Sequence, residues 1–175
     1  LTRNSTSTKL FVNGRQDGST YSDSLNYVQG STVRIGKHNS DTQYDFEGYI
    51  SDFRWIKGDS IYPFLPVAET ITTTTSYQNA ITVATGDVEL IMAHASGFTD
   101  GSDNSHSLTN NGATIDTSNY PASGMKSIAF ADGDYVDVAA SSTFAPGTGD
   151  FTIECWCYSI NRGNYDYIID GRNSG

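Results

Sequence analysis

The chain has 175 residues, 37% of them hydrophobic, and no apolar run is long enough to cross a bilayer, so membrane insertion is not expected. It carries 20 acidic side chains against 10 lysines and arginines, and the resulting net charge of -10 disfavours a nucleic-acid partner. Serine and threonine together number 41, with 17 glycines and 11 tyrosines. This composition is unlike that of a helical bundle or a disordered acidic tail, and it predicts an all-β extracellular domain.

The negative charge belongs to the later part of the chain. Residues 1–66 hold seven basic and seven acidic side chains, whereas residues 67–175 hold three basic and thirteen acidic ones. Pro63, Pro66 and the tract Thr72–Thr75 fall near this change, and an extended β-branched tract suits a linker. We therefore expect three parts: a segment 1–66, a linker 67–86 and a segment 87–175.

Short strand-like runs follow one another along the chain, separated by turn dipeptides such as Asn13-Gly14 and Asp132-Gly133. No segment has a sustained helical period. Many short strands with turns at this spacing are typical of a β-sandwich or jelly roll. The expected strands, in chain order, are Lys9–Val12, Thr32–Gly36, Glu47–Ile56, Val88–Ala93, Ser127–Ala131, Tyr135–Val138, Phe151–Tyr158 and Tyr167–Asp170.

Two of these runs, Glu47–Ile56 and Phe151–Tyr158, show the clearest alternation. In each run the odd-numbered residues are expected on one face of the strand and the even-numbered residues on the other. Cys155 and Cys157 then share a face, in a geometry that does not suit a mutual disulfide. We interpret them as small hydrophobic residues on a core-facing strand.

Five segments resemble motifs of laminin-G-like, concanavalin A-like jelly rolls. Residues 1–14 resemble the "TRN…LFVNG" hairpin, and residues 33–54 resemble the "IG…F-x-G-x-I-x-D-x-R" segment that closes such a domain. Residues 98–106, 128–138 and 151–158 resemble the "F-x-D-x-S-G-N-x-H", "L-x-F-D-G-x-D-Y-V-x-V" and "F-T-I-E-x-W-V" motifs. The resemblance implies an all-β, concanavalin A-like jelly-roll β-sandwich.

The order of these motifs is swapped. In the family the "F-T-I-E-x-W" strand precedes the "LFVNG" hairpin, but here it follows it. A further strand or more usually lies between the "DGR" end, here residues 170–172, and the "LTRN" start, here residues 1–4. We expect a window of a tandem array, with the C-terminal half of one jelly roll in residues 1–66 and the N-terminal half of the next in residues 87–175. The alternative is one circularly permuted jelly roll, which a contact between Phe151–Tyr158 and Glu47–Ile56 within one chain would favour.

Asp100, Ser102 and Asn104 alternate along a loop, an arrangement that can present three oxygen ligands to a hard cation such as calcium. The resemblance implies a structural calcium in some members, with Asp52 as a further ligand. The alternative interpretation is an ordinary turn, because aspartate, serine and asparagine all favour turns.

Aromatic side chains offer flat surfaces on which the apolar side of a sugar ring can stack. The candidate tyrosines are Tyr44, Tyr49, Tyr62, Tyr158, Tyr165 and Tyr167. The loop Asn161–Tyr165 is the expected place of exposed contact, through Asn161, Asn164 and Tyr165. The alternative interpretation is that tyrosine is simply common on strands.

Catalysis is not expected. Glucanases of the concanavalin A-like type need paired carboxylates, and Phe151–Tyr158 offers only Glu154. We therefore expect a structural or adhesive repeat of an extracellular virion appendage, such as a tail fibre, or of a cell-surface protein. Its expected partners are neighbouring repeats or subunits and, weakly and multivalently, cell-surface glycans. The alternative is a spacer or decoration domain without a ligand.

Overall fold

The computed structural model describes residues 1–28, 32–40, 44–61, 88–92, 97–161 and 166–172. These residues form antiparallel sheets without an α-helix, so the all-β prediction is confirmed, while the expected linker 67–86 lies outside the described residues. The strands are β1 Thr2–Asn4, β2 Ser7–Val12, β3 Arg15–Ser22, β4 Thr32–Ile35, β5 Glu47–Lys57, β6 Val88–Met92, β7 Leu108–Asn111, β8 Thr114–Asp116, β9 Ser127–Phe130, β10 Tyr135–Ala139, β11 Phe151–Asn161 and β12 Ile169–Asp170.

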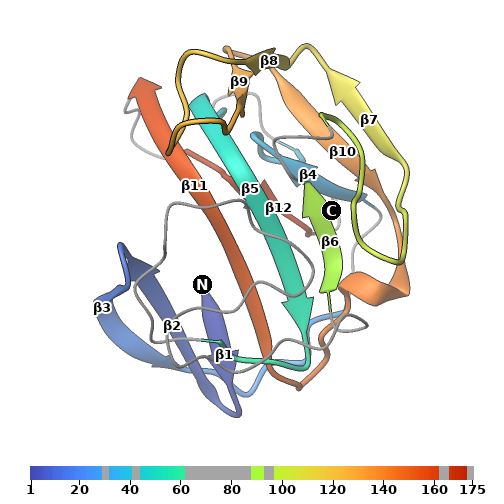
Figure 1. Cartoon of the computed structure of the whole chain (residues 1–175). Coiled ribbons are helices and arrows are strands. Elements are labelled where there is room, and N and C mark those ends of the chain that lie inside the picture. Colours follow the sequence, from blue (N-terminus) through green and yellow to red (C-terminus); the bar gives the residue numbers. More distant parts are fainter. Residues whose placement is uncertain (29–31, 41–43, 62–87, 93–96, 162–165, 173–175) are drawn as a thin grey trace.

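The described strands make two sheets, the arrangement of a β-sandwich. The larger sheet has the order β3-β2-β1-β11-β5-β9-β8, and β6 pairs with β5 beside β9. The smaller sheet has the order β12-β4-β10-β7. Figure 1 shows β5 and β11 running side by side across the molecule, with the β2–β3 hairpin at one end of the larger sheet.

The core lies between the two sheets and follows from the alternation of apolar residues. Val33 and Ile35 on β4 and Val136 and Val138 on β10 are fully buried on one side. They pack in the same cluster as apolar side chains of β5, β6 and β9. The alternating strands of the smaller sheet thus have one buried face each, as expected for one layer of a sandwich.

The pairing of β5 with β11 joins the two segments of the chain. The two strands run antiparallel from Phe151 opposite Lys57 to Asn161 opposite Glu47. β1 also pairs with β11, and β4 pairs with β10 in the smaller sheet. The two segments therefore pack into one sandwich within this chain, while the circular permutation and the origin in a tandem array stay predictions.

Cations of the first segment meet polar groups of the second. The Arg54 guanidinium on β5 forms a buried ion pair with Glu154 on β11, with 2.6 Å between Nε and Oε1. Arg34 on β4 pairs with Asp137 on β10 at 2.8 Å. Arg3 is buried and donates to the Gly147 carbonyl of the second segment at 3.3 Å, as well as to the Leu25 carbonyl of its own segment at 2.9 Å. The uneven charge of the two segments is therefore matched in part across their interface.

A bulge at Asp52 changes the faces of β5. Arg54 lies opposite Glu154 and Ser51 opposite Trp156, so β5 holds one residue more than β11 between these two pairs. Asp52 has a φ of +50°, a conformation that aspartate tolerates better than most residues. Ile50, on the far side of the bulge, therefore faces the core together with Phe53. The expectation that odd-numbered residues share one face along all of β5 is wrong.

We expect Glu154→Gln to lower the free energy of unfolding by about 3 kcal/mol, because it removes the carboxylate from a buried ion pair and leaves the Arg54 charge in the interior. Urea denaturation measures this loss. The matched control is Asp17→Asn on the exposed strand β3, which removes one negative charge with little effect. Equal stability of the two variants would show that the ion pair does not hold β5 to β11.

The Asp170 carboxylate on β12 also links the segments. It accepts hydrogen bonds from the Asn39 backbone N–H at 3.1 Å and from the Arg172 backbone and guanidinium at 2.9 to 3.0 Å. Burial by itself raises the pKa of Asp170, but the Arg172 and Asn39 hydrogen bonds outweigh it and hold this pKa at about 2, below the ordinary 3.8. The carboxylate therefore stabilises the fold above about pH 4.

We expect the stability that Asp170 contributes to be lost as the pH falls from about 4 to about 2, because its pKa is lower in the folded than in the unfolded chain. Asp170→Asn should lower the melting temperature at pH 7 and make its decline between pH 4 and pH 2 shallower. The exposed Asp132→Asn serves as the control. Parallel acid profiles for the native chain and Asp170→Asn would contradict this assignment.

Candidate functional site

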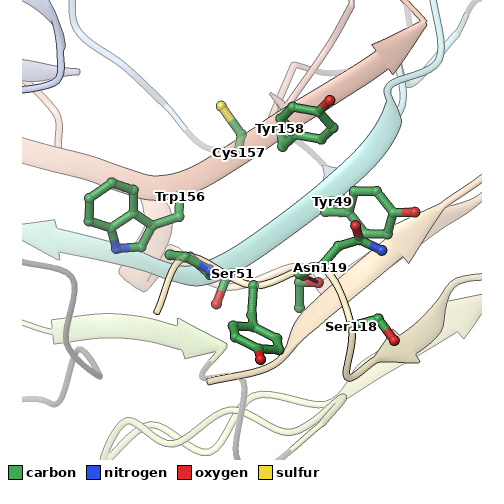
Figure 2. Close-up of a pocket in the computed structure, with 10 residues that line it drawn as sticks. Tyr49, Ser51, Ser118, Asn119, Trp156, Cys157 and Tyr158 are labelled. Carbon is green, nitrogen blue, oxygen red and sulfur yellow. Dashed lines mark hydrogen bonds between the residues drawn. The ribbon is translucent and has the colours of Figure 1, made fainter. Parts of the chain in front are cut away.

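The outer face of the larger sheet carries a groove of about 370 Å³, here called the aromatic groove. Its floor comes from β5, β9 and β11, and one wall comes from the loop that follows β8. Figure 2 shows Tyr49 and Ser51 on one strand beside Trp156 and Tyr158 on the next, with Ser118 and Asn119 on the loop. The described lining residues are Tyr49, Ser51, Ser118, Asn119, Tyr120, Pro121, Ser127, Trp156, Cys157 and Tyr158.

The register between β5 and β11 places the aromatic side chains of the floor. Tyr158 lies opposite Tyr49, and their rings stack with centroids 6.2 Å apart and an angle of 29° between planes. Trp156 lies two residues from Tyr158 and so points to the same face. Gly48 precedes Tyr49 at a φ of +153°, and a Cβ there would lie 2.1 Å from the Tyr158 carbonyl oxygen. Only glycine lets the two backbones approach this closely beside the stacked tyrosines.

Hydrogen bonds hold the loop wall against the sheet. The Asp116 carboxylate accepts from the backbone N–H groups of Asn119 and Ser118, and these bonds lower the pKa of Asp116. The Ser127 hydroxyl on β9 donates to the Asn119 carbonyl, and the Ser51 hydroxyl on β5 donates to the Lys126 carbonyl at 2.7 Å. The loop is thus tied at both ends, which keeps the groove formed without a ligand.

The groove combines exposed aromatic rings with neutral polar groups. Tyr158 is 65% exposed and Tyr120 is 43% exposed. Asn119 and the serines supply amide and hydroxyl groups beside these rings. Among the described lining residues there is no aspartate, glutamate, lysine or arginine. Such a surface suits a neutral ligand that has an apolar face and a rim of hydroxyl groups.

The structure brings Asp100, Ser102 and Asn104 together as a hydrogen-bonded turn on β6. The Asp100 carboxylate accepts from the backbone N–H groups of Ile91 at 3.1 Å and His106 at 2.8 Å, and from the Ser102 N–H and hydroxyl at 2.9 Å each. The Ser102 hydroxyl and the Asn104 amide reach the Glu89 carbonyl on β6. The turn therefore closes an edge of this strand.

In this arrangement the Asp100 carboxylate is held within the turn. Each of its two oxygens accepts two hydrogen bonds. Asp52 lies in the bulge of β5. Within the described part of the chain, no group of three histidine, cysteine or acidic residues is arranged to hold a metal. Calcium binding stays a prediction.

The other predicted contact residues are only partly described. Asn161 ends β11, where its amide donates to Glu47 at 2.8 Å, away from the residues that line the aromatic groove. Asn164 and Tyr165 lie outside the described residues. Of the tyrosines proposed for stacking, Tyr49 and Tyr158 line the groove, whereas Tyr44 and Tyr167 pack with His38 elsewhere.

Sequence reasoning missed the loop wall. Ser118, Asn119, Tyr120 and Pro121 follow a short strand that alternation does not mark clearly. The signal available was an aromatic residue within a run of turn formers, Ser118-Asn119-Tyr120-Pro121. Trp156 was placed on the correct face beside Tyr158, but its role in the groove depends on the register with β5.

Comparison with protein families, curated proteins and solved structures finds no match to this chain. Among the described residues no helix has the length and apolar character needed to span a membrane. The function therefore has to be argued from the geometry of the chain itself.

We expect Asp100→Ala to lower the free energy of unfolding by about 2 kcal/mol, because four donors lose the carboxylate that accepts from them. The loss should be the same in EDTA and in millimolar calcium, measured as urea midpoints. The exposed neighbour Asp103→Ala is the control. A calcium-dependent stabilisation of the native chain that Asp100→Ala abolishes would establish the metal site instead.

Proposed function

We propose that the chain is a glycan-binding, adhesive domain with a concanavalin A-like jelly-roll fold, which belongs to an extracellular appendage of a virion or to a cell-surface protein. The observation that carries this proposal is the aromatic groove. Its stacked Tyr49 and Tyr158 offer flat apolar surface, and Asn119 and the serines are polar residues of the same lining. The swapped motif order and the extracellular composition support the setting.

The residues that line the groove restrict the charge of the glycan that it can bind. A sulfated or sialylated glycan is bound most strongly through charge-assisted hydrogen bonds from lysine or arginine, and the described residues of the groove include neither. The net charge of -10 adds general repulsion of polyanions. A volume of about 370 Å³ accommodates one or two sugar rings. The proposed ligand is therefore a neutral glycan, bound weakly at each site and strengthened by many copies.

Binding is favoured over hydrolysis. Glu154 has its carboxylate in the buried ion pair with Arg54 and does not line the groove, and the described lining residues include no carboxylate. Retaining and inverting glycosidases both require two carboxyl groups across the scissile bond. A ligand-free spacer is the remaining alternative, and the exposed aromatic rings of a preformed groove disfavour it.

We expect a multimerised form of the chain to bind neutral glycans on an array, and Tyr158→Ala to weaken that binding at least about fivefold, since one stacked ring contributes on the order of 1 kcal/mol. Tyr120→Ala should act in the same direction from the opposite wall. Tyr21→Ala, which removes an exposed tyrosine on β3 far from the groove, is the matched control.

Two results would contradict this function. Retention on sulfated or sialylated glycans alone would place the binding surface elsewhere. If the multimer of the native chain binds no glycan on the array, although the native chain and all three variants are folded, the ligand-free spacer becomes the supported function.

A further inference from the structure

The two serines on the strands of the aromatic groove use their hydroxyl hydrogens inside the protein. The Ser51 hydroxyl donates to the Lys126 carbonyl at 2.7 Å, and the Ser127 hydroxyl donates to the Asn119 carbonyl. Ser51 is 4% exposed and Ser127 is 1% exposed. Because a hydroxyl group has a single hydrogen to donate, neither serine keeps a donor for a ligand. These two residues support the loop wall and do not select the ligand.

Asn119 is an exposed residue of the same lining, and its backbone is fixed on both sides. Its N–H donates to the Asp116 carboxylate, and its carbonyl accepts from Ser127. The neighbouring Ser118 N–H also donates to Asp116, at 2.8 Å. Figure 2 shows Asn119 and Ser118 together on this loop. The position of Asn119 is therefore set before a ligand arrives, which lowers the entropy lost on binding.

The Asp116 carboxylate also decides how the Asn119 amide is turned. Asn119 Nδ2 donates to Asp116 Oδ1 at 3.3 Å. The opposite orientation would place the amide oxygen against a carboxylate oxygen, and an ionised carboxylate can only accept hydrogen bonds. The hydrogen bonds from Asn119 and Ser118 lower the pKa of Asp116, so the carboxylate is ionised at neutral pH. It therefore holds the amide in this one orientation.

This orientation leaves the amide oxygen available. Asp116 does not belong to the residues that line the aromatic groove, so Nδ2 is turned toward a partner outside the lining. Oδ1 lies on the other side of the amide. Among the described residues, none donates a hydrogen bond to the Asn119 Oδ1. The groove thus offers a fixed hydrogen-bond acceptor in the same lining as its stacked aromatic rings.

We propose that Asn119 is a specificity-determining residue of the aromatic groove, and that its Oδ1 accepts a hydrogen bond from a free hydroxyl group of the bound sugar. The inference rests on the proposed glycan-binding function and narrows it. The ligand is a neutral sugar whose hydroxyl is unsubstituted at the position next to Asn119. A sugar that carries an ether, an ester or a deoxy position there leaves the amide oxygen without a donor. Asp116 acts through Asn119, as a positioning residue.

The probes are the methyl glycosides of glucose, galactose and mannose, and the forms of each in which one ring hydroxyl is replaced by fluorine. Fluorine is close in size to a hydroxyl group but has no hydrogen to donate. Titration into the native chain is followed by NMR, with an expected dissociation constant on the order of 10 mM for a parent glycoside that binds. Fluorine at the position next to Asn119 should weaken binding at least about fivefold.

Variants of the chain test the same contact from the protein side. Asn119→Leu keeps the size of the side chain without its acceptor, so it should bind the parent and the fluorinated glycoside equally weakly. Asn26→Leu changes an exposed asparagine that does not line the groove and is the matched control. Asp116→Ala lets the amide turn and should reduce the discrimination. Asp116→Asn keeps an acceptor oxygen and should restore part of it.

The outcomes separate this inference from the function on which it rests. Equal binding of the parent and every fluorinated form to the native chain would overturn the inference alone, and so would undiminished discrimination by Asn119→Leu. Binding on the glycan array without binding of any glycoside at about 100 mM would also contradict it, because recognition would not depend on one ring. No binding in either measurement would overturn the proposed function as well.

Discussion

The pairing of β5 with β11 is the interaction on which the rest of the structure depends. It takes one strand from each segment of the chain and fixes their register over the full length of both. That register sets the buried Arg54–Glu154 ion pair and the Tyr49–Tyr158 stack. A shift by one residue would reverse the faces and abolish both features.

Much of the fold follows from local sequence, because apolar alternation depends only on neighbouring residues. The predicted runs Glu47–Ile56 and Phe151–Tyr158 correspond to β5 and β11, and Thr32–Gly36 corresponds to β4. β3 was missed because it is polar and exposed along its length, so it lacks the signal of a buried face. The bulge at Asp52 was missed because a positive φ at a non-glycine residue leaves no reliable mark in one sequence.

Less of the candidate site than of the fold can be predicted from the sequence. Tyr158 and Trp156 share a face by simple alternation, and this part was correct. The groove also needs Asn119 and Tyr120, which reach it only because β8 pairs with β9 and β9 pairs with β5. The Asp100 turn shows the converse case. Its residue spacing suits a cation and a turn alike, and only the tertiary structure shows the backbone donors of β6 and His106 that bond to the carboxylate.

The position of β1 has a consequence for how the chain folds. Leu1 pairs with Ile153, a separation of 152 residues, and the Arg54–Glu154 contact spans 100. Such distant contacts make loop closure costly before any pairing rewards it, which favours folding in milliseconds to seconds rather than microseconds. During synthesis β1, β2 and β5 emerge long before β11. Until β11 has been made, the backbone groups that pair with it and the apolar side chains that pack against it stay exposed. A chain of this topology gains from assistance by chaperones until its last long strand has been made.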